Sequence, residues 1–438
     1  METDKTTLTD LSIFYSEEEF SVFNKLNFTR TAGGKEQLYE NFSAALPSIE
    51  AIEGVQQTIR CILENVQHWP AMITNGTIMV VEKFYESTID EIPSNPTSFS
   101  AYSYKIFHAP DYSLVKYSAG HCFDLVKGMQ LMVQEFLTND TPAPLREQLE
   151  SAKKIISKEQ FEPVANNKSI SELSAVQQLQ LAGFIRYNYK HHMLDLISIY
   201  SKLDAWYSMA MAVKHLNLVF PRFFKTEQPS FTARGLYHLL LNKPVAYGIM
   251  MNPETNFLFL TGANMAGKST FIKSVGTAVF LAHIGMGVPA EQLELSFFDG
   301  LLSNINVVDN IARGESYFYN EVQRIKSTIN KINNGKKWLI LIDELFKGTN
   351  VQDAMKCSST VIEGLLKIKN SLFILSTHLY EIGDDLKKYP NISFNYFETN
   401  VYNDQLQFSY QLKEGISNDR LGYLILKREG VVDLLERL

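Results

Sequence analysis

A loop that could bind phosphate lies at residues 261–270. Gly262, Gly267, Lys268 and Ser269 have the spacing of a P-loop. Its glycines let backbone N–H groups surround phosphate oxygens, while the lysine reaches the β- and γ-phosphates and the serine hydroxyl binds Mg²⁺. An apolar run precedes the loop, and the helix expected at 269–283 points its N-terminus at the anion. The sequence therefore predicts ATP and Mg²⁺ as ligands, and the loop residues expected to hold them are Gly262, Ala263, Asn264, Met265, Ala266, Gly267, Lys268, Ser269 and Thr270.

Two acidic residues follow the apolar run 338–342. With a P-loop upstream, Asp343 is expected to hold the Mg²⁺ shell, directly or through water, and Ser269 is the second expected metal ligand. Glu344 is expected to orient or deprotonate the attacking water. The alternative is a buried strand whose exposed end happens to be acidic, and the upstream loop favours catalysis over it.

Two further polar residues, His378 and Ser316, lie next to predicted elements. His378 comes directly after the apolar run 372–375 and should face the crevice at the carboxyl end of a sheet. There it could sense the γ-phosphate or polarise water, the alternative being a loop histidine with a local hydrogen bond. Ser316 lies in a polar segment before a helix expected to end near residue 335, where simple N-capping is the alternative to a role at the nucleotide.

The elements that position these residues divide the chain at about residue 235. Residues 1–234 contain 7 of the 23 glycines, and residues 235–438 contain 16. The first part is therefore expected to be helical and the second to form a sheet with many turns. Apolar spacing predicts helices at 49–66 and 114–137. It also gives 172–216 a helical pattern, and this segment would be about 65–70 Å long if it formed one helix. Continuous apolar runs at 256–260, 338–342 and 372–375 predict strands of an α/β sheet, and 393–402 with 405–412 predict a hairpin.

Composition limits the class of protein. The 438 residues are 45% apolar and carry a formal charge of −7, which excludes a protein that coats nucleic acid through bulk positive charge but leaves a local basic groove open. Three cysteines without a C-x-x-C pair disfavour a disulfide framework or a zinc ribbon. The N-terminus is polar, and no apolar run approaches the length needed to span a membrane. We therefore expect a soluble cytoplasmic protein without a membrane partner.

The motifs and their order resemble those of the MutS family of DNA mismatch repair ATPases. The family's P-loop reads Thr-Gly-Pro-Asn-Met-Gly-Gly-Lys-Ser-Thr, from which this chain departs at Ala263 and Ala266. Residues 281–285 and 288–290 look like its Leu-Ala-His-Ile-Gly and Val-Pro-Ala, and residues 343–350 are similar to its Asp-Glu-x-x-Arg-Gly-Thr-Ser. Glu315 stands where the family usually has Arg. More weakly, residues 22–34 and 203–208 resemble the start of the family's core/lever domain and a stretch near the end of the lever.

The resemblance implies an α/β P-loop ATPase domain of the ABC type at 235–438, preceded by a predominantly α-helical core/lever domain at 1–234. It also implies a homodimer in which the Ser316 loop reaches the partner's nucleotide. Because the resemblance starts at the lever domain, we also expect the family's mismatch-reading and connector domains to be missing. Two functions are therefore expected: an ATP-dependent DNA-binding protein of the mismatch repair type that does not read mismatches directly, with a repair protein as a further partner, or an ATP-driven switch that acts on a protein partner without DNA. Another ABC-type ATPase is disfavoured because no Leu-Ser-Gly-Gly signature or long heptad pattern appears.

Overall fold

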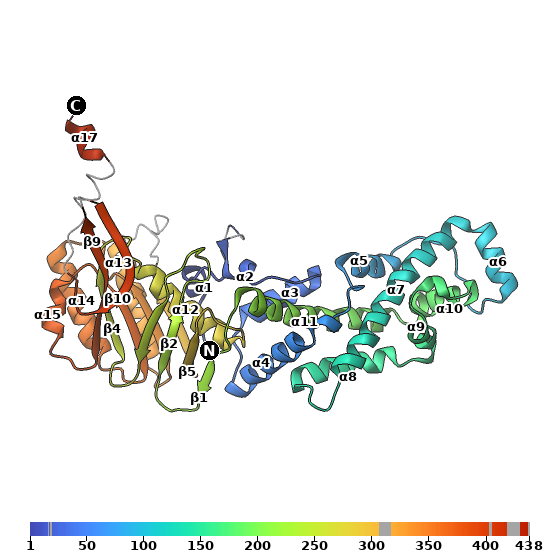
Figure 1. The fold of residues 1–438 in the computed structure, drawn as a ribbon, viewed down its shortest axis with the longest axis horizontal. Coiled ribbons are helices and arrows are strands. Elements are labelled where there is room, and N and C mark those ends of the chain that lie inside the picture. The colour runs from blue at the N-terminus through green and yellow to red at the C-terminus, as the bar shows by residue number, and fades with distance from the viewer. Residues whose placement is uncertain (16, 18–19, 306–316, 403–404, 418–429, 437–438) are drawn as a thin grey trace. The chain divides into compact units, whose positions relative to one another are not determined.

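The computed structural model describes residues 1–438 except 16, 18–19, 306–316, 403–404, 418–429 and 437–438 (Figure 1). The chain forms two compact units. The C-terminal unit comprises Met1–Lys25, Ala45–Ile52 and Leu216–Leu438, and the helical unit comprises Leu26–Ala44 and Glu53–His215. These limits differ from the expected boundary at 234/235, since three segments before it belong with the C-terminal unit. The functional labels of the two expected domains stay predictions.

Between residues 26 and 216 the described secondary structure is entirely helical, as the scarcity of glycine predicts (Figure 1). The expected helices at 49–66 and 114–137 correspond to α4 and α7. The α-helices are α3 (Ala32–Ser43), α4 (Ile49–Glu64), α5 (Asn75–Phe84), α6 (Ser98–Phe107), α7 (Ala109–Phe136), α8 (Ala143–Ile156), α9 (Glu162–Asn166), α10 (Ala175–Gly183) and α11 (Lys190–Leu216). Short 3₁₀ turns lie at η2 (Val66–His68), η3 (Glu159–Phe161) and η4 (Ile170–Glu172).

The segment 172–216 does not form one helix, because the structure divides it. Ser174 starts α10 with a capping box to Gln177, and a π-helical turn, η5 (Phe184–Asn188), separates α10 from α11. At this break Phe184 stacks on Tyr189 with ring centroids 4.8 Å apart, and both rings contact Phe161. Packing of these aromatic rings thus accompanies the interruption of a pattern that reads as continuous in the sequence.

A buried carboxylate joins α11 to the segment that begins the helical unit. Asp204 accepts hydrogen bonds from the backbone N–H groups of Arg30 (3.0 Å) and Thr31 (2.9 Å) and from the Thr31 hydroxyl (2.7 Å). Burial raises the pKa of Asp204, although these hydrogen bonds lower it. Gly34 is required beside it, since a Cβ there would lie 2.1 Å from the carboxylate. The two segments that resemble the family's lever, 22–34 and 203–208, therefore meet at Asp204.

A six-stranded sheet in the order β10-β9-β4-β8-β7-β6 forms the centre of the C-terminal unit. Its strands are β4 (Phe257–Gly262), β6 (Gly300–Asn304), β7 (Trp338–Asp343), β8 (Ser371–Ser376), β9 (Ile392–Tyr402) and β10 (Gln405–Glu414). All neighbours pair in parallel except β9 and β10, which pair in antiparallel register and confirm the predicted hairpin. The three apolar runs predicted as buried strands correspond to β4, β7 and β8.

Both faces of this sheet are covered, which explains why its strands are apolar without alternation. Leu341 faces α12 (Lys268–His283), where it lies 2.6 Å from the position of a Cβ on Gly276. Ile340 and Ile342 belong to the core shared with α13 (Tyr317–Ile332), α14 (Val351–Leu365) and α15 (Glu381–Leu386). Successive residues of β7 thus pack into opposite layers.

A second, four-stranded sheet in the order β1-β5-β2-β3 was not predicted. Its strands are β1 (Arg222–Phe224), β2 (Phe231–Leu236), β3 (Tyr247–Met251) and β5 (Gln292–Ser296), and the last helix of the described residues is α17 (Val431–Glu436). Because β1 and β2 begin before residue 235, this sheet accounts for part of the shifted boundary.

The N-terminal segment packs on the edge of the large sheet through α1 (Lys5–Asp10), followed by α2 (Val22–Lys25). The fully buried Asp10 carboxylate accepts hydrogen bonds from the Ser303 hydroxyl (2.6 Å) and the backbone N–H of Ile305 (3.0 Å). Arg324 of α13 forms an ion pair with the same oxygen at 3.0 Å. These contacts explain why residues 1–25 belong with the C-terminal unit rather than with the helices that follow them.

Replacement of the buried carboxylate in the helical unit should strongly destabilise the protein. Asp204→Ala leaves the N–H groups of Arg30 and Thr31 without their acceptor, so we expect the free energy of unfolding to fall by about 2–4 kcal/mol. The matched control is Asp195→Ala on the exposed side of α11, which should stay within about 0.5 kcal/mol of the wild type. Urea unfolding measures both, and equal stability of the two variants would contradict the role given to Asp204.

Candidate functional site

The predicted site residues come together because three neighbouring strands end side by side. In the parallel register, Ser376 of β8 pairs with Leu260 of β4 on one side and with Asp343 of β7 on the other. Beyond these strand ends, the N–H of Glu344 donates to the Ser376 carbonyl at 3.0 Å, and the N–H of Thr377 donates to the Leu260 carbonyl at 2.9 Å. The loop at 262–269, the acidic pair and the Thr377–His378 segment therefore emerge at one edge of the sheet.

The loop after β4 places a lysine at the start of a helix. Gly267 caps α12 with a φ of +110°, a left-handed conformation suited to glycine. The ammonium group of Lys268 donates to the carbonyls of Gly262 (2.8 Å) and Ala263 (3.0 Å). Burial lowers the pKa of Lys268 to about 8, although the charges of Glu344 and Asp343 raise it. A cation and a helix N-terminus at one place favour an anionic ligand.

A cavity of about 440 Å³ opens at this loop. Of the predicted loop residues, Asn264, Met265, Gly267, Lys268, Ser269 and Thr270 line it, whereas Ala263 and Ala266 are buried. Glu344 lines the same cavity. Its remaining walls are formed by Leu241, Lys243, Val245, Tyr247 and Tyr410.

The two acidic residues after β7 have different surroundings. Asp343 is buried, and its carboxylate accepts a hydrogen bond from the Ser376 hydroxyl. Glu344 follows with a φ of +61°, and its carboxylate lies 2.6 Å from Nε2 of His378 and 3.1 Å from Nζ of Lys347. Burial raises the pKa of Glu344, but the hydrogen bond and charge of His378, together with Lys347, lower it to about 2. Glu344 is therefore an ion-paired carboxylate at neutral pH.

His378 makes a local hydrogen bond, as the alternative to a catalytic role expects. Its partner is Glu344, the predicted catalytic acid. Lys347, Glu321 and Tyr410 also belong to the site, although the sequence did not single them out. A possible signal for Lys347 is its spacing of three residues from Glu344. Tyr410 gives none, because only the hairpin of β9 and β10 brings it to the cavity. Ser316 lies outside the described residues.

Comparison with known proteins finds a match for the segment that holds this site. Residues 258–433 match the family model of MutS domain V. The match begins within β4 and contains the loop at 262–269, the acidic pair and His378.

The chain is also similar to longer proteins. It is 30% identical over 245 residues to the human MutS protein homolog 4. The aligned region covers 53% of this chain and 25% of the relative. It is 27% identical over 242 residues to the DNA mismatch repair protein MutS of Streptococcus suis (strain 98HAH33). Here the aligned region covers 54% of this chain and 28% of the relative. The chain thus spans about a quarter of the length of each relative. The chain is thus similar to both proteins over about half of its own length.

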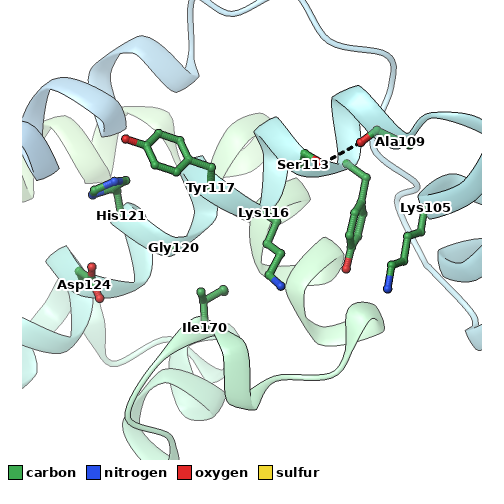
Figure 2. Close-up of a pocket in the computed structure, with 10 residues that line it drawn as sticks. Lys105, Ala109, Ser113, Lys116, Tyr117, Gly120, His121, Asp124 and Ile170 are labelled. Atoms are coloured by element: carbon green, nitrogen blue, oxygen red, sulfur yellow. Dashed lines mark hydrogen bonds between the residues drawn. The ribbon is translucent and has the colours of Figure 1, made fainter.

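The helical unit has a hollow of its own, of about 620 Å³. Figure 2 shows Lys105 and Lys116 on one part of its wall and His121 and Asp124 on another, with Gly120 of α7 and Ile170 between. Burial raises the pKa of Asp124, and the charge of His121 lowers it. Because the wall carries charges of both signs, the hollow is not a basic groove. Among the described residues, no helix has the length and apolar character needed to cross a bilayer.

The conformation of Gly267 gives a stability prediction. A side chain at φ +110° is strained, and its Cβ would also lie 3.4 Å from the Tyr410 ring. We therefore expect Gly267→Ala to lower the free energy of unfolding by about 1–2 kcal/mol. Gly364→Ala on α14 is the control, since nothing lies within 4 Å of its Cβ position, and it should be neutral or stabilising by up to about 1 kcal/mol. Thermal unfolding of both variants tests the difference, and a neutral Gly267→Ala would show that the loop tolerates a side chain.

Proposed function

We propose that the chain is a Mg²⁺-dependent ATPase whose MutS domain V binds ATP through a P-loop at residues 262–269. One observation carries this proposal: Lys268 and Glu344, a cation suited to phosphate and an acid suited to activating water, line the same cavity. The cavity volume of about 440 Å³ lies in the range of small-molecule sites.

The residues present fit both ligands. The Lys268 ammonium group donates to the loop carbonyls of Gly262 and Ala263, and a phosphate oxygen can replace these acceptors. For the metal, the Ser269 hydroxyl and the Asp343 carboxylate are hard oxygen donors of the kind Mg²⁺ prefers. Bound Mg²⁺ would neutralise phosphate charge, and these two residues would hold it. Tyr247 and Tyr410 offer aromatic rings to the base.

In the proposed reaction, water attacks the γ-phosphate and ADP leaves. Lys268 and the loop N–H groups stabilise the charge on the transferring phosphoryl group. Glu344 orients the water and accepts its proton, while His378 holds the Glu344 carboxylate in place at 2.6 Å. Since Glu344 is ion-paired before ATP binds, its partners must change during the cycle.

We further propose a homodimer that ATP switches between conformations, with the Ser316 segment of each subunit completing the partner's site. DNA is the proposed target, because one relative is a DNA mismatch repair protein. The proposal does not include direct reading of mismatches. The alternative is a switch that acts on a protein partner, and the charges of both signs at the hollow of the helical unit favour it.

Loss of either central side chain should abolish ATP turnover. We expect Lys268→Ala and Glu344→Gln to lower kcat by roughly 10²-fold or more, because each removes a group that acts on the transferring phosphate or the water. Lys336→Ala and Glu254→Gln are controls at exposed positions of the same unit and should keep the wild-type rate. Phosphate release measures all four, and wild-type turnover by Glu344→Gln would reject its role.

Binding to DNA distinguishes the two proposed targets. Homoduplex, mismatched, branched and single-stranded DNA are titrated with the protein, with and without ATP, across a salt series. For a DNA-binding protein, the logarithm of the binding constant should fall linearly with the logarithm of the salt concentration, because phosphate contacts release counterions. An intact ATPase that binds no DNA at low salt would support the protein-partner switch instead.

A further inference from the structure

A short loop returns the chain to the predicted catalytic acid. Glu344 and Phe346 both have left-handed φ values, +61° and +60°, and the side chain of Lys347 turns back so that its Nζ lies 3.1 Å from the Glu344 carboxylate. Left-handed backbone at two non-glycine residues is strained and persists only where surrounding contacts fix it. Contacts around residues 346–348 therefore hold this loop in place.

Glu321 of α13 fixes the backbone of this loop. Its buried carboxylate accepts hydrogen bonds from the N–H groups of Lys347 and Gly348, each at 3.2 Å. Phe346 is buried and packs on Phe318 of the same helix, with ring centroids 5.7 Å apart. The backbone at Lys347 is thus held from α13, while its side chain is 39% exposed and can move at the end of a four-carbon stem.

The ammonium group of Lys347 lies beside the phosphate cavity. Its contact, Glu344, lines the cavity together with Lys268 and Ser269. The positive charge of Lys347 is also close enough to Lys268 to contribute to the lowering of that group's pKa. Through its contact with Glu344, Lys347 therefore lies next to the region where the proposed function brings a phosphate close to the water-activating acid.

We propose that Lys347, held in place by Glu321, is a second phosphate-binding cation that exchanges the Glu344 carboxylate for the γ-phosphate when ATP binds. This inference rests on the proposed ATPase function. It assigns the γ-phosphate because an ammonium in contact with Glu344 lies at the end of the nucleotide where water attacks. The exchange frees one carboxylate oxygen of Glu344 for the water, so the substrate itself releases the residue that acts on it.

The exchange predicts discrimination between ATP and ADP. Lys347→Met should weaken binding of the non-hydrolysable analogue β,γ-imido-ATP by about tenfold, as expected for loss of a charge-assisted contact. ADP affinity should change less than about twofold, since ADP has no γ-phosphate. Lys347→Arg should bind the analogue about as tightly as the wild type. Glu321→Gln should bind it more weakly than the wild type but more tightly than Lys347→Met. Isothermal titration calorimetry measures each affinity, with circular dichroism to establish that the variants fold and Lys347→Gln as a second uncharged variant.

The outcomes separate this inference from the proposed function. If the wild-type protein binds neither nucleotide, the ATPase proposal falls and the inference falls with it. If the wild type binds both, an equal loss of ADP and analogue affinity in Lys347→Met overturns the inference alone, because it indicates a structural role. Unchanged affinity for both ligands overturns it as well. Only a selective loss that arginine repairs supports it.

Discussion

The parallel register of β4, β8 and β7 is the constraint on which the site depends. Ser376 occupies the middle strand and pairs with Leu260 and Asp343 at the same level. A slip of one residue in either pair would turn every side chain of the strand to the other face. The register is fixed because both faces are buried, with Leu341 toward α12 and Ile340 and Ile342 toward α13–α15. Chemistry at the strand ends is thus positioned by packing along their whole length.

Three buried carboxylates hold segments outside the sheet in place through hydrogen bonds. Asp10 fixes the N-terminal segment to β6 and α13, Glu321 fixes the loop after β7, and Asp204 fixes the start of the helical unit. Each accepts at least one backbone N–H, which compensates its removal from water. In each case an acidic side chain holds a stretch of chain that has no regular hydrogen-bonding partner of its own.

The sequence predicted what depends on local pattern. The loop at 262–269, the acidic pair after β7 and the hairpin near the end were found because their residue types and apolar runs are contiguous. The break within 172–216 was not predicted, since periodicity does not reveal the aromatic packing of Phe184 and Tyr189 that accompanies the π turn. Tyr410 and Glu321 were missed because their roles arise from pairing and packing between distant segments.

The place of Asp10 in the fold has a consequence for the order in which the protein forms during synthesis. Its partner Ser303 lies 293 residues further along the chain. At roughly 5–20 residues per second, a ribosome needs about 15–60 s to produce that partner after Asp10 itself. Within that interval the helical unit, whose last residue is His215, is completed first. The N-terminal segment therefore lacks its hydrogen-bond partners until β6, the edge strand of the large sheet, has been synthesised.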